Sequence, residues 1–445
     1  MISADYLIIG TGPIGVFSAK YLLEKGKKII IVDNASKKNK EINLGLKLKD
    51  SETKEFVYDF ENTGNYKNKK TLPISSKING GFTKVWGGTL NKPDKNEIEK
   101  LGISEKKYSQ LYFSILNDIP HIKYDNFYKH FNETSTKYYQ IEEPLIGIGA
   151  DFDEVWSSSQ LLDNLIKKYK NSIKYFNYVD VEKIINRKNC FRLNLKNDYI
   201  EFNVEKVFVC AGVFSSTKIA SNMLEADSFS IDDSELSVWP VFKLGKKISK
   251  DKSHSKDSHF SKNKAFAKLI IKFKRNDNLL KSQLYELNQE AISTIIKRLG
   301  IFGKVFLPLI NFFEKRLYLI FIYKDSNHSK KSLFKIDEQN KVQIESIKNP
   351  KFKQYVISYF FRYMKLSFLL IPIKYKFKNY GSFHSGNSVF YKNGEEYVFD
   401  DSGSFKGFDN IHFVDSAVIK FIPSGPFTIS SIVISKNILD NLIND

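Results

Sequence analysis

Residues 6–15 read YLIIGTGPIG and residues 29–33 read IIIVD, and these two stretches decide the fold. Each contains a run of four apolar residues, which is typical of a short, buried parallel strand. The residues between the two runs have a helical pattern. The order strand, glycine turn, helix, strand and acid predicts a βαβ unit that binds a dinucleotide, and it favours this interpretation over an ordinary βαβ unit with a glycine turn.

Each residue of the turn has a physical task in this prediction. Gly10 permits the tight turn, Gly12 lets a pyrophosphate approach the backbone, and Gly15 lets helix and strand pack closely. The helix points its free N–H groups and positive dipole end at the pyrophosphate. The Asp33 carboxylate is placed to accept hydrogen bonds from a ribose. We therefore expect cofactor binding at Gly10, Gly12, Pro13, Ile14, Gly15 and Asp33.

The composition is that of a globular protein with a basic surface. The chain has 445 residues, 42% of them hydrophobic, and a formal net charge of +19. This length suits two domains. Lysines are spread from end to end and accompany no DNA- or RNA-binding motif, so we do not expect nucleic acid as a partner. A solvated lysine surface is the default interpretation, with an anionic substrate or membrane surface second.

Cysteine usage and hydropathy favour a cytoplasmic location. Cys190 and Cys210 are the only cysteines, which excludes a disulfide framework and a thiolate metal site and indicates a reducing compartment. No metal is expected. The N-terminus leads directly into a strand without a signal peptide, and no apolar run reaches the length of a membrane span.

Two stretches leave a peripheral membrane contact open, on the inner membrane surface. Residues 299–313 and 355–375 are apolar, aromatic and studded with basic residues. We favour a core-facing helix or pair of strands for them. The alternative is a surface that rests on an anionic membrane, with Lys and Arg at headgroup level.

Three further stretches complete a family pattern. Residues 80–88 read GGFTKVWGG, residues 209–216 read VCAGVFSS, and residues 413–429 contain FVDSA and PSGPFTI. Together with residues 10–15 they resemble, in the same order, the signatures of the glucose–methanol–choline (GMC) oxidoreductases. These flavoenzymes oxidise alcohols and sugars, so the resemblance implies FAD as the cofactor.

The resemblance implies an α/β fold: a doubly wound, Rossmann-like FAD-binding domain with a second, α+β substrate domain. Residues 1–100, 150–226 and 381–445 would form the FAD-binding domain. Residues 101–149 and 227–380 would form the substrate domain or cap. The resemblance also implies FAD contacts at Gly81, Thr83, Trp86, Gly87, Gly88, Val181, Ala211, Gly212, Asp415, Ser416, Pro426, Phe427 and Thr428.

Catalysis is assigned through the same resemblance. His384 stands in a glycine-rich loop at the place of the family's catalytic histidine, and a near-neutral pKa suits a general base for a hydroxyl proton. The family's second polar residue, before the terminal Pro-x-x-T segment, is replaced by Gly425. Ser424, Asn387 or Ser385, or a residue of the middle region, could supply the missing hydrogen bond.

The expected reaction is oxidation of a CH–OH group by hydride transfer to flavin. The substrate would be a small molecule, a sugar or sugar-linked compound, and the basic surface suits an anionic or nucleotide-linked one. Two alternatives stay open. One is a flavoenzyme of the redox-neutral or reductase type. The other is a non-catalytic protein with a relic nucleotide site that docks to a membrane or partner. The sequence makes no prediction of the oligomeric state.

Overall fold

The structure is a computed structural model that describes residues 2–35, 76–84, 86–123, 135–136, 138–149, 155–187, 190–195, 198–234, 236–244, 267–273, 280–286, 316–329, 331–336, 342–348, 363–364, 366, 368–370 and 385–444. The predicted base His384 lies outside these residues, as do residues 299–313 and most of residues 355–375. Predictions about them therefore stay predictions.

Five short strands form a parallel sheet in the order β22, β11, β2, β3 and β7. Their bounds are Ile411–Phe413, Lys206–Val209, Tyr6–Ile9, Ile29–Val32 and Ile173–Phe176. β2 and β3 are buried at every residue, because their apolar side chains face a core on both sides of the sheet. The strands predicted from the apolar runs that begin at residues 6 and 29 are thus confirmed.

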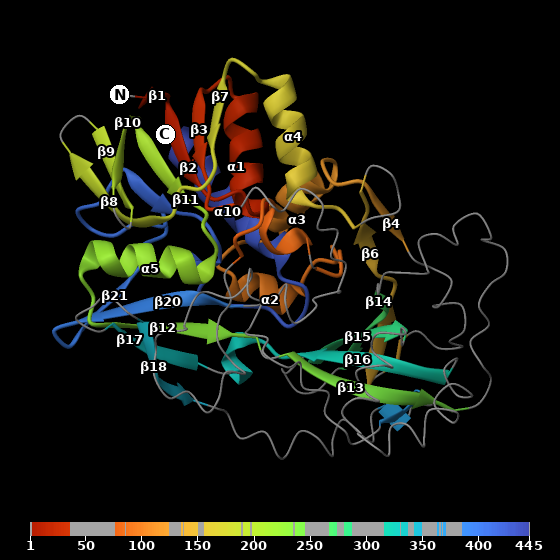
Figure 1. Ribbon diagram of the computed structural model, residues 1–445. Helices are drawn as coiled ribbons and strands as arrows, with labels where there is room; N and C mark the ends of the chain where they lie inside the picture. The colour runs from red at the N-terminus through yellow and green to blue at the C-terminus, as the bar shows by residue number, and fades with distance from the viewer. Residues whose placement is uncertain are drawn as a thin grey trace, which may run out of the picture.

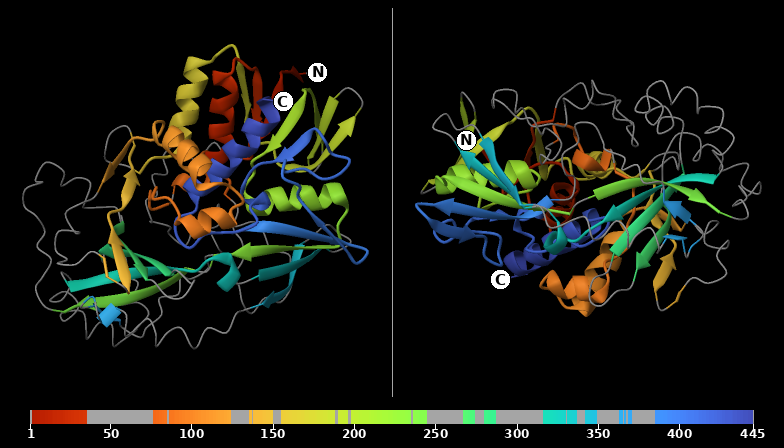
Figure 2. Two further views of the ribbon diagram at one scale, coloured as in Figure 1. Left: turned by 180° about the vertical axis from the view of Figure 1, so that it is seen from behind. Right: turned by 90° about the horizontal axis from the view of Figure 1, so that it is seen from below.

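Helices cover one face of this sheet. They are α1 (Pro13–Glu24), α3 (Glu105–Leu116), α4 (Ser158–Lys168) and α10 (Thr428–Asn444). Their apolar side chains form one core with Ile8 and the other residues of that face. Figure 2 shows α10 (blue) beside α1 (red) and α3 (orange), with which it is in contact.

The opposite face is covered mainly by strands. β8 (Val181–Arg187), β9 (Cys190–Leu195) and β10 (Tyr199–Asn203) form an antiparallel ribbon, and β1 (Ile2–Ser3) adds to β10 in parallel. Together with α5 (Val213–Leu224) this ribbon forms a second core against the sheet. The predicted α/β, Rossmann-like fold class is confirmed. The second layer is a ribbon plus one helix.

A five-stranded antiparallel sheet lies beside α5. Its order is β18 (Val342–Lys348), β17 (Lys331–Ile336), β12 (Ser228–Asp233), β20 (Ser385–Lys392) and β21 (Glu395–Val398). β20 and β12 pair directly, so this sheet joins chain segments on both sides of the boundary predicted at residue 381. The exact division into two domains stays a prediction.

A six-stranded antiparallel sheet completes the second part of the molecule. Its order is β19 (Phe368–Leu370), β13 (Leu236–Lys243), β16 (Leu317–Tyr323), β15 (Leu280–Glu286), β14 (Ala267–Phe273) and β5 (Tyr139–Glu142). One of its faces forms a separate apolar core. Figure 1 shows the parallel sheet and its helices above the two antiparallel sheets, which run along the lower side of the molecule.

Short elements connect these layers. They are η3 (Gly81–Lys84), α2 (Lys95–Lys100), β4 (His121–Lys123), β6 (Leu145–Gly147), η7 (Ser326–His328) and η8 (Ser416–Val418). Within the described ranges, no helix is long and apolar enough to cross a membrane.

Candidate active site

The predicted binding residues gather at the carboxyl edge of the parallel sheet. β2 is followed by Gly10, β3 by Asp33, β11 by the turn to Gly212, and β22 by Val414 and Asp415. In open α/β sheets, ligands bind at this edge, where the chain connections diverge to opposite sides. Here the connections diverge between β2 and β11, because β3 lies beyond β2 and β22 lies beyond β11.

Two glycines allow the sheet and α1 to approach closely. Gly10 has φ +107°, a conformation that favours glycine, and a Cβ there would overlap the carbonyl oxygen of Cys210. A Cβ on Gly15 would overlap the carbonyl oxygen of Gly10. Ile14, between them, is buried in the helical core. These residues bring the first turn of α1 directly onto the end of β2.

The N-terminus of α1 is open. Gly12 is its N-cap with φ −59° and no side-chain cap, and Pro13 is the first helical residue. A Cβ added to Gly12 would meet no atom within 4 Å. The first N–H groups of a helix have no partner within the helix, and they bind phosphates where a group can approach. The geometry at Gly12 allows such an approach.

Asp33 is hydrogen-bonded to the glycine turn that follows β2. Its Oδ2 accepts a hydrogen bond from the backbone N–H of Thr11 and another, of 2.5 Å, from the Thr11 hydroxyl. Burial raises the pKa of Asp33 to about 6, although the bonds from Thr11 and the Ala35 amide oppose this. The predicted ribose contact of Asp33 stays a prediction; what the carboxylate holds in the structure is the turn.

The second motif lies against the first. A Cβ on Gly81 would come within 3.2 Å of Gly12 Cα, so residues 80–84 pass directly over the glycine turn. Thr83 is buried. Its hydroxyl donates a hydrogen bond of 2.5 Å to the Gly80 carbonyl and accepts one of 3.0 Å from the Ser158 amide. Thr83 therefore fixes the loop to the start of α4.

The rest of this motif faces two different neighbours. The indole N–H of Trp86 donates a hydrogen bond of 2.8 Å to the carbonyl of Trp156, and the ring packs against the helical core. A Cβ on Gly87 would lie 3.1 Å from the hydroxyl of Tyr285, on β15. Gly88 has φ +67°, and a Cβ there would overlap Val155. The glycine pair thus lets the loop pass between the helical layer and the six-stranded sheet.

The third and fourth motifs are joined by one carboxylate. Asp415 is buried; its Oδ2 accepts from the Gly212 amide at 2.8 Å and the Ser216 hydroxyl at 2.5 Å, and its Oδ1 accepts from the Ala417 amide at 2.9 Å. Burial raises the pKa of Asp415 to about 6 against these three bonds. Gly212 has φ +83°, caps α5 without a side-chain bond and has open space where a Cβ would lie.

The remaining predicted contacts of these motifs have ordinary packing roles. Ala211 and Val181 are half-buried and pack against the second core, Val181 at the start of β8. Ser416 begins η8 and is half-buried. Their contacts with a cofactor stay predictions.

The segment before α10 is hydrogen-bonded to α2. Both the amide (2.8 Å) and the hydroxyl (2.6 Å) of Ser424 donate to Oε1 of Glu97. Gly425 has φ +130°, which favours glycine, and a Cβ there would lie 3.6 Å from Cδ of Lys281. Phe427 is buried in the helical core, whereas Pro426 and Thr428 on either side of it are half-buried.

Asn387 and Ser424, two of the residues predicted to supply the missing hydrogen bond, are hydrogen-bonded to other residues of the protein. Asn387, on β20, has φ +53°, and its amide donates a hydrogen bond of 2.6 Å to Oδ2 of Asp232. Ser424 is bonded to Glu97 as described. Each of the two side chains is thus tied to a different element, and their roles in catalysis stay predictions.

A buried charge network under this segment was not foreseen from the sequence. Lys281 pairs with Glu97 and, at 2.8 Å, with Asp94, while Lys272 pairs with Asp94 at 2.7 Å and Glu142 at 2.5 Å. Burial opposes ionisation of Asp94, but the two lysines outweigh it and lower its pKa. In the same way Glu97 and Asp94 overcome burial and raise the pKa of Lys281.

The edge fits a dinucleotide such as FAD. Two helices, α1 and α5, begin there with glycine caps, and the space over Gly12 and Gly212 would be filled by any larger residue. The Gly81 and Gly87 loop lies alongside. The donors are backbone N–H groups, which suit a pyrophosphate. Among the described residues, no group of His, Cys, Asp and Glu could hold a metal ion.

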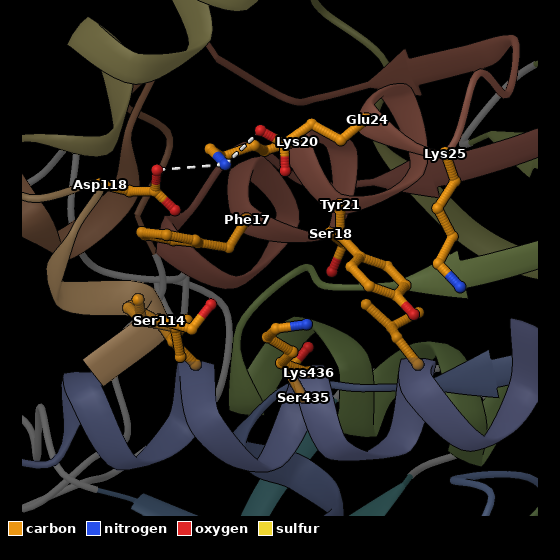
Figure 3. Close-up of a pocket in the computed structure, with 13 residues that line it drawn as sticks. Phe17, Ser18, Lys20, Tyr21, Glu24, Lys25, Ser114, Asp118, Ser435 and Lys436 are labelled. Carbon is orange, nitrogen blue, oxygen red and sulfur yellow. Dashed lines mark hydrogen bonds and ion pairs between the residues drawn. The ribbon is translucent and has the colours of Figure 1, made fainter. Parts of the chain in front are cut away.

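A groove of about 230 Å³ lies between α1, α3 and α10, away from the candidate site. Figure 3 shows the side chains that line it. None of the predicted site residues lines it. Lys20 pairs with Glu24 of the same helix at 2.5 Å and with Asp118 at 3.1 Å, and Lys436 pairs with Asp440 at 3.2 Å. Lys20 and Lys436 are thus already matched by carboxylates.

No protein-family model and no curated protein match the sequence. Among solved structures, the fold resembles that of pyridoxine 4-oxidase from Mesorbium loti, with a TM-score of 0.63 and 10% sequence identity over 99% of each chain. The likeness covers the parallel sheet and the antiparallel sheets together. At this identity it shows the fold.

Proposed function

We propose that the protein is an FAD-dependent oxidoreductase that oxidises a hydroxyl group of a small molecule. One observation carries this proposal: four motifs spread over more than 400 residues converge on one edge of one sheet. Gly81 lies against Gly12, and Asp415 is bonded to Gly212. The likeness over the whole chain to a protein that is by name an oxidase supports the same conclusion.

In this proposal each element holds one part of FAD. The N-terminus of α1 binds the pyrophosphate, and Asp33 binds the ribose. The Gly87 loop and the residues before α10 would hold the flavin ring, and the N-terminus of α10 would face its pyrimidine part. A helix N-terminus stabilises negative charge at that part of the ring. FAD, when bound, supplies the acceptor of a hydride and its two electrons.

The protein then supplies the proton acceptor and the substrate contacts. His384 takes the hydroxyl proton, a task for which a side chain of near-neutral pKa is suited. Ser424 already donates its hydroxyl proton to Glu97, so it can offer only acceptor lone pairs to a substrate. Asn387 donates to Asp232. Ser424 therefore cannot donate to a substrate oxygen, and Asn387 has one amide N–H besides the one that it donates to Asp232.

A sugar or sugar-linked compound is the proposed substrate class. An anionic or nucleotide-linked sugar, suggested by the net charge of +19, finds no support in the buried network, where two lysines face three carboxylates. We therefore place uncharged hydroxyl compounds first. Turnover of these should depend little on salt, because screening affects mainly charged partners.

Anaerobic absorption spectroscopy tests the proposal. The flavin-loaded protein is mixed without oxygen with sugars, polyols, nucleotide sugars and pyridoxine, and free FAD receives the same panel as a control. We expect bleaching of the flavin by at least one hydroxyl compound. A flavin that no hydroxyl compound bleaches, but that is reoxidised after chemical reduction by a compound with a double bond, would contradict the proposal and favour a reductase.

A further inference from the structure

The six-stranded sheet has one apolar face and one face on which polar and apolar side chains are mixed. Successive side chains of a strand point to opposite faces. On β15, Leu284 belongs to the apolar core of the sheet, so Lys281, Gln283 and Tyr285 lie on the other face. All three are buried, with exposed fractions of 5%, 1% and 3%. The mixed face is therefore covered by other parts of the protein.

What covers it are the two glycine loops of the candidate site. At one end of β15, Lys281 Cδ lies 3.6 Å from where a Cβ of Gly425 would be. At the other end, the Tyr285 hydroxyl lies 3.1 Å from where a Cβ of Gly87 would be. Gln283 is midway between Lys281 and Tyr285 on the same face. It therefore lies between the contacts that β15 makes with the two loops.

The amide of Gln283 is hydrogen-bonded to two tyrosines. Its Oε1 accepts hydrogen bonds from the hydroxyls of Tyr285 at 2.6 Å and Tyr323 at 3.0 Å. Burial raises the pKa of both phenols above their ordinary value, so both are protonated at neutral pH. The Nε2 group is buried and has no hydrogen-bond partner among the described residues. A buried donor without an acceptor destabilises a fold, so such a group normally has a ligand or water partner.

We propose that Gln283 is a substrate-binding residue, whose amide N–H groups bind an acceptor oxygen of an uncharged substrate. The inference rests on the proposed function, because it places the substrate between the Gly87 and Gly425 loops. It supplies a donor that Ser424 cannot, because the Ser424 hydroxyl already donates to Glu97. Lys281 does not select an anion, because Glu97 and Asp94 already neutralise it. The selected acceptor is a neutral one, such as the ring oxygen of a pyranose.

A matched pair of probes tests this assignment. Tetrahydropyran and cyclohexane have the same shape and differ by one ring oxygen in place of a methylene, and neither carries a hydroxyl group that the protein could oxidise. Their dissociation constants are measured on the flavin-loaded protein from the shift of the flavin spectrum and from the rise in melting temperature. We expect the wild type to bind the oxygen-containing probe about tenfold more tightly, the size of one hydrogen bond.

Two variants locate that preference in the amide. Gln283→Glu keeps an acceptor for the two tyrosines but has no N–H donor, and Gln283→Leu removes both functions. Both should bind the two probes equally. The control is Gln140→Leu, on β5 of the same sheet, where the amide donates to Glu142 at 3.2 Å. This variant should keep the wild-type preference.

Three results would overturn the inference: no binding of either probe, equal binding by the wild type, or an unchanged preference in Gln283→Glu. These outcomes are independent of the proposed reaction, because binding is read without turnover. A flavin that no hydroxyl compound bleaches, combined with a Gln283-dependent preference, would refute the reaction and keep the binding residue. Bleaching without such a preference would support the reaction and refute Gln283 as the binding residue.

Discussion

The hydroxyl of Ser216 donates a hydrogen bond of 2.5 Å to Oδ2 of Asp415, although 199 residues separate them in the chain. This bond joins the first turn of α5 to the end of β22. Asp33 and Thr11 form a matching bond of 2.5 Å at the end of β3. Each carboxylate at the edge is thus bound to a hydroxyl of a neighbouring turn, and the protein's own hydrogen bonds hold the edge in shape.

Replacing Asp415 by Asn should destabilise the FAD-free protein, because one of three buried donors then meets an amide N–H group. We expect a loss of about 1–3 kcal/mol in the free energy of unfolding. The measurement is urea denaturation. Ser216→Ala, which removes one of the three bonds, should cost about 1 kcal/mol by the same method.

The loss in Asp415→Asn should depend on pH. The pKa of Asp415 is raised to about 6 in the folded protein from an ordinary value of 3.8, so the folded state binds this proton more tightly. Ionised Asp415 therefore costs stability above pH 6, and the wild type gains stability as the pH falls from 7 towards 4. Asn does not titrate, so the loss should be larger at pH 5 than at pH 7. A loss that shrinks at pH 5 would mean that the three donors lower the pKa instead.

Gly12 and Gly15 should respond differently to alanine. Gly15→Ala places a methyl group against the Gly10 carbonyl and should cost about 1–3 kcal/mol of stability in the FAD-free protein. Gly12→Ala meets open space at an ordinary φ and should change that stability by less than about 0.5 kcal/mol. Urea denaturation of both variants checks this. Equal losses would show that the space over Gly12 is not open.

The buried charge network should be worth more than a surface pair. Glu97 is 5% exposed and joins Lys281 to Ser424, so Glu97→Gln leaves a buried ammonium with only Asp94 as counter-ion. We expect a loss of about 3 kcal/mol, near the lower limit for breaking a buried pair.

The matched control is the exposed pair of Lys420 and Asp401, 3.0 Å apart. Lys420→Ala should cost less than about 1 kcal/mol. Thermal and urea denaturation of the two variants provide the comparison. Similar losses in both would contradict the structural role given to Glu97.

His384→Ala should leave FAD bound and slow flavin reduction by roughly 10²–10⁴-fold, the usual range for the loss of a general base. Stopped-flow absorbance with the substrate found in the anaerobic panel measures the rate. Loss of the base should also remove the dependence of the rate on pH near neutrality. An undiminished rate would exclude His384 from the mechanism.

The parallel sheet and its edge could be predicted because their signals are local. Four apolar residues, a glycine turn and a helical pattern follow one another within residues 6–25, and β11 with α5 repeats this order. The acids at the ends of β3 and β22 were found in the same way. Their partners Thr11 and Ser216 were not, since nothing in the sequence marks a hydroxyl as the partner of a distant carboxylate.

The buried polar side chains on the mixed face of the six-stranded sheet could not be predicted. Residues 280–286 read LKSQLYE, which has a mixed pattern on both faces and gave no strand signal. The pairing of Lys281 with Glu97 spans 184 residues, and only the fold brings them together. The alternation of Lys281, Gln283 and Tyr285 was the one sign available, and it gains meaning only once β14 and β16 are known to flank it.

FAD binding by the wild type and by Gly12→Ala tests the central claim most directly. Both proteins, freed of flavin, are titrated with FAD and followed by flavin fluorescence. The wild type should bind FAD at a ratio of about one per chain, and Gly12→Ala should bind at least about tenfold more weakly, because its methyl group occupies the place of the pyrophosphate. A wild type that does not bind FAD, or a variant that binds it equally well, would contradict the assignment of this edge as the cofactor site.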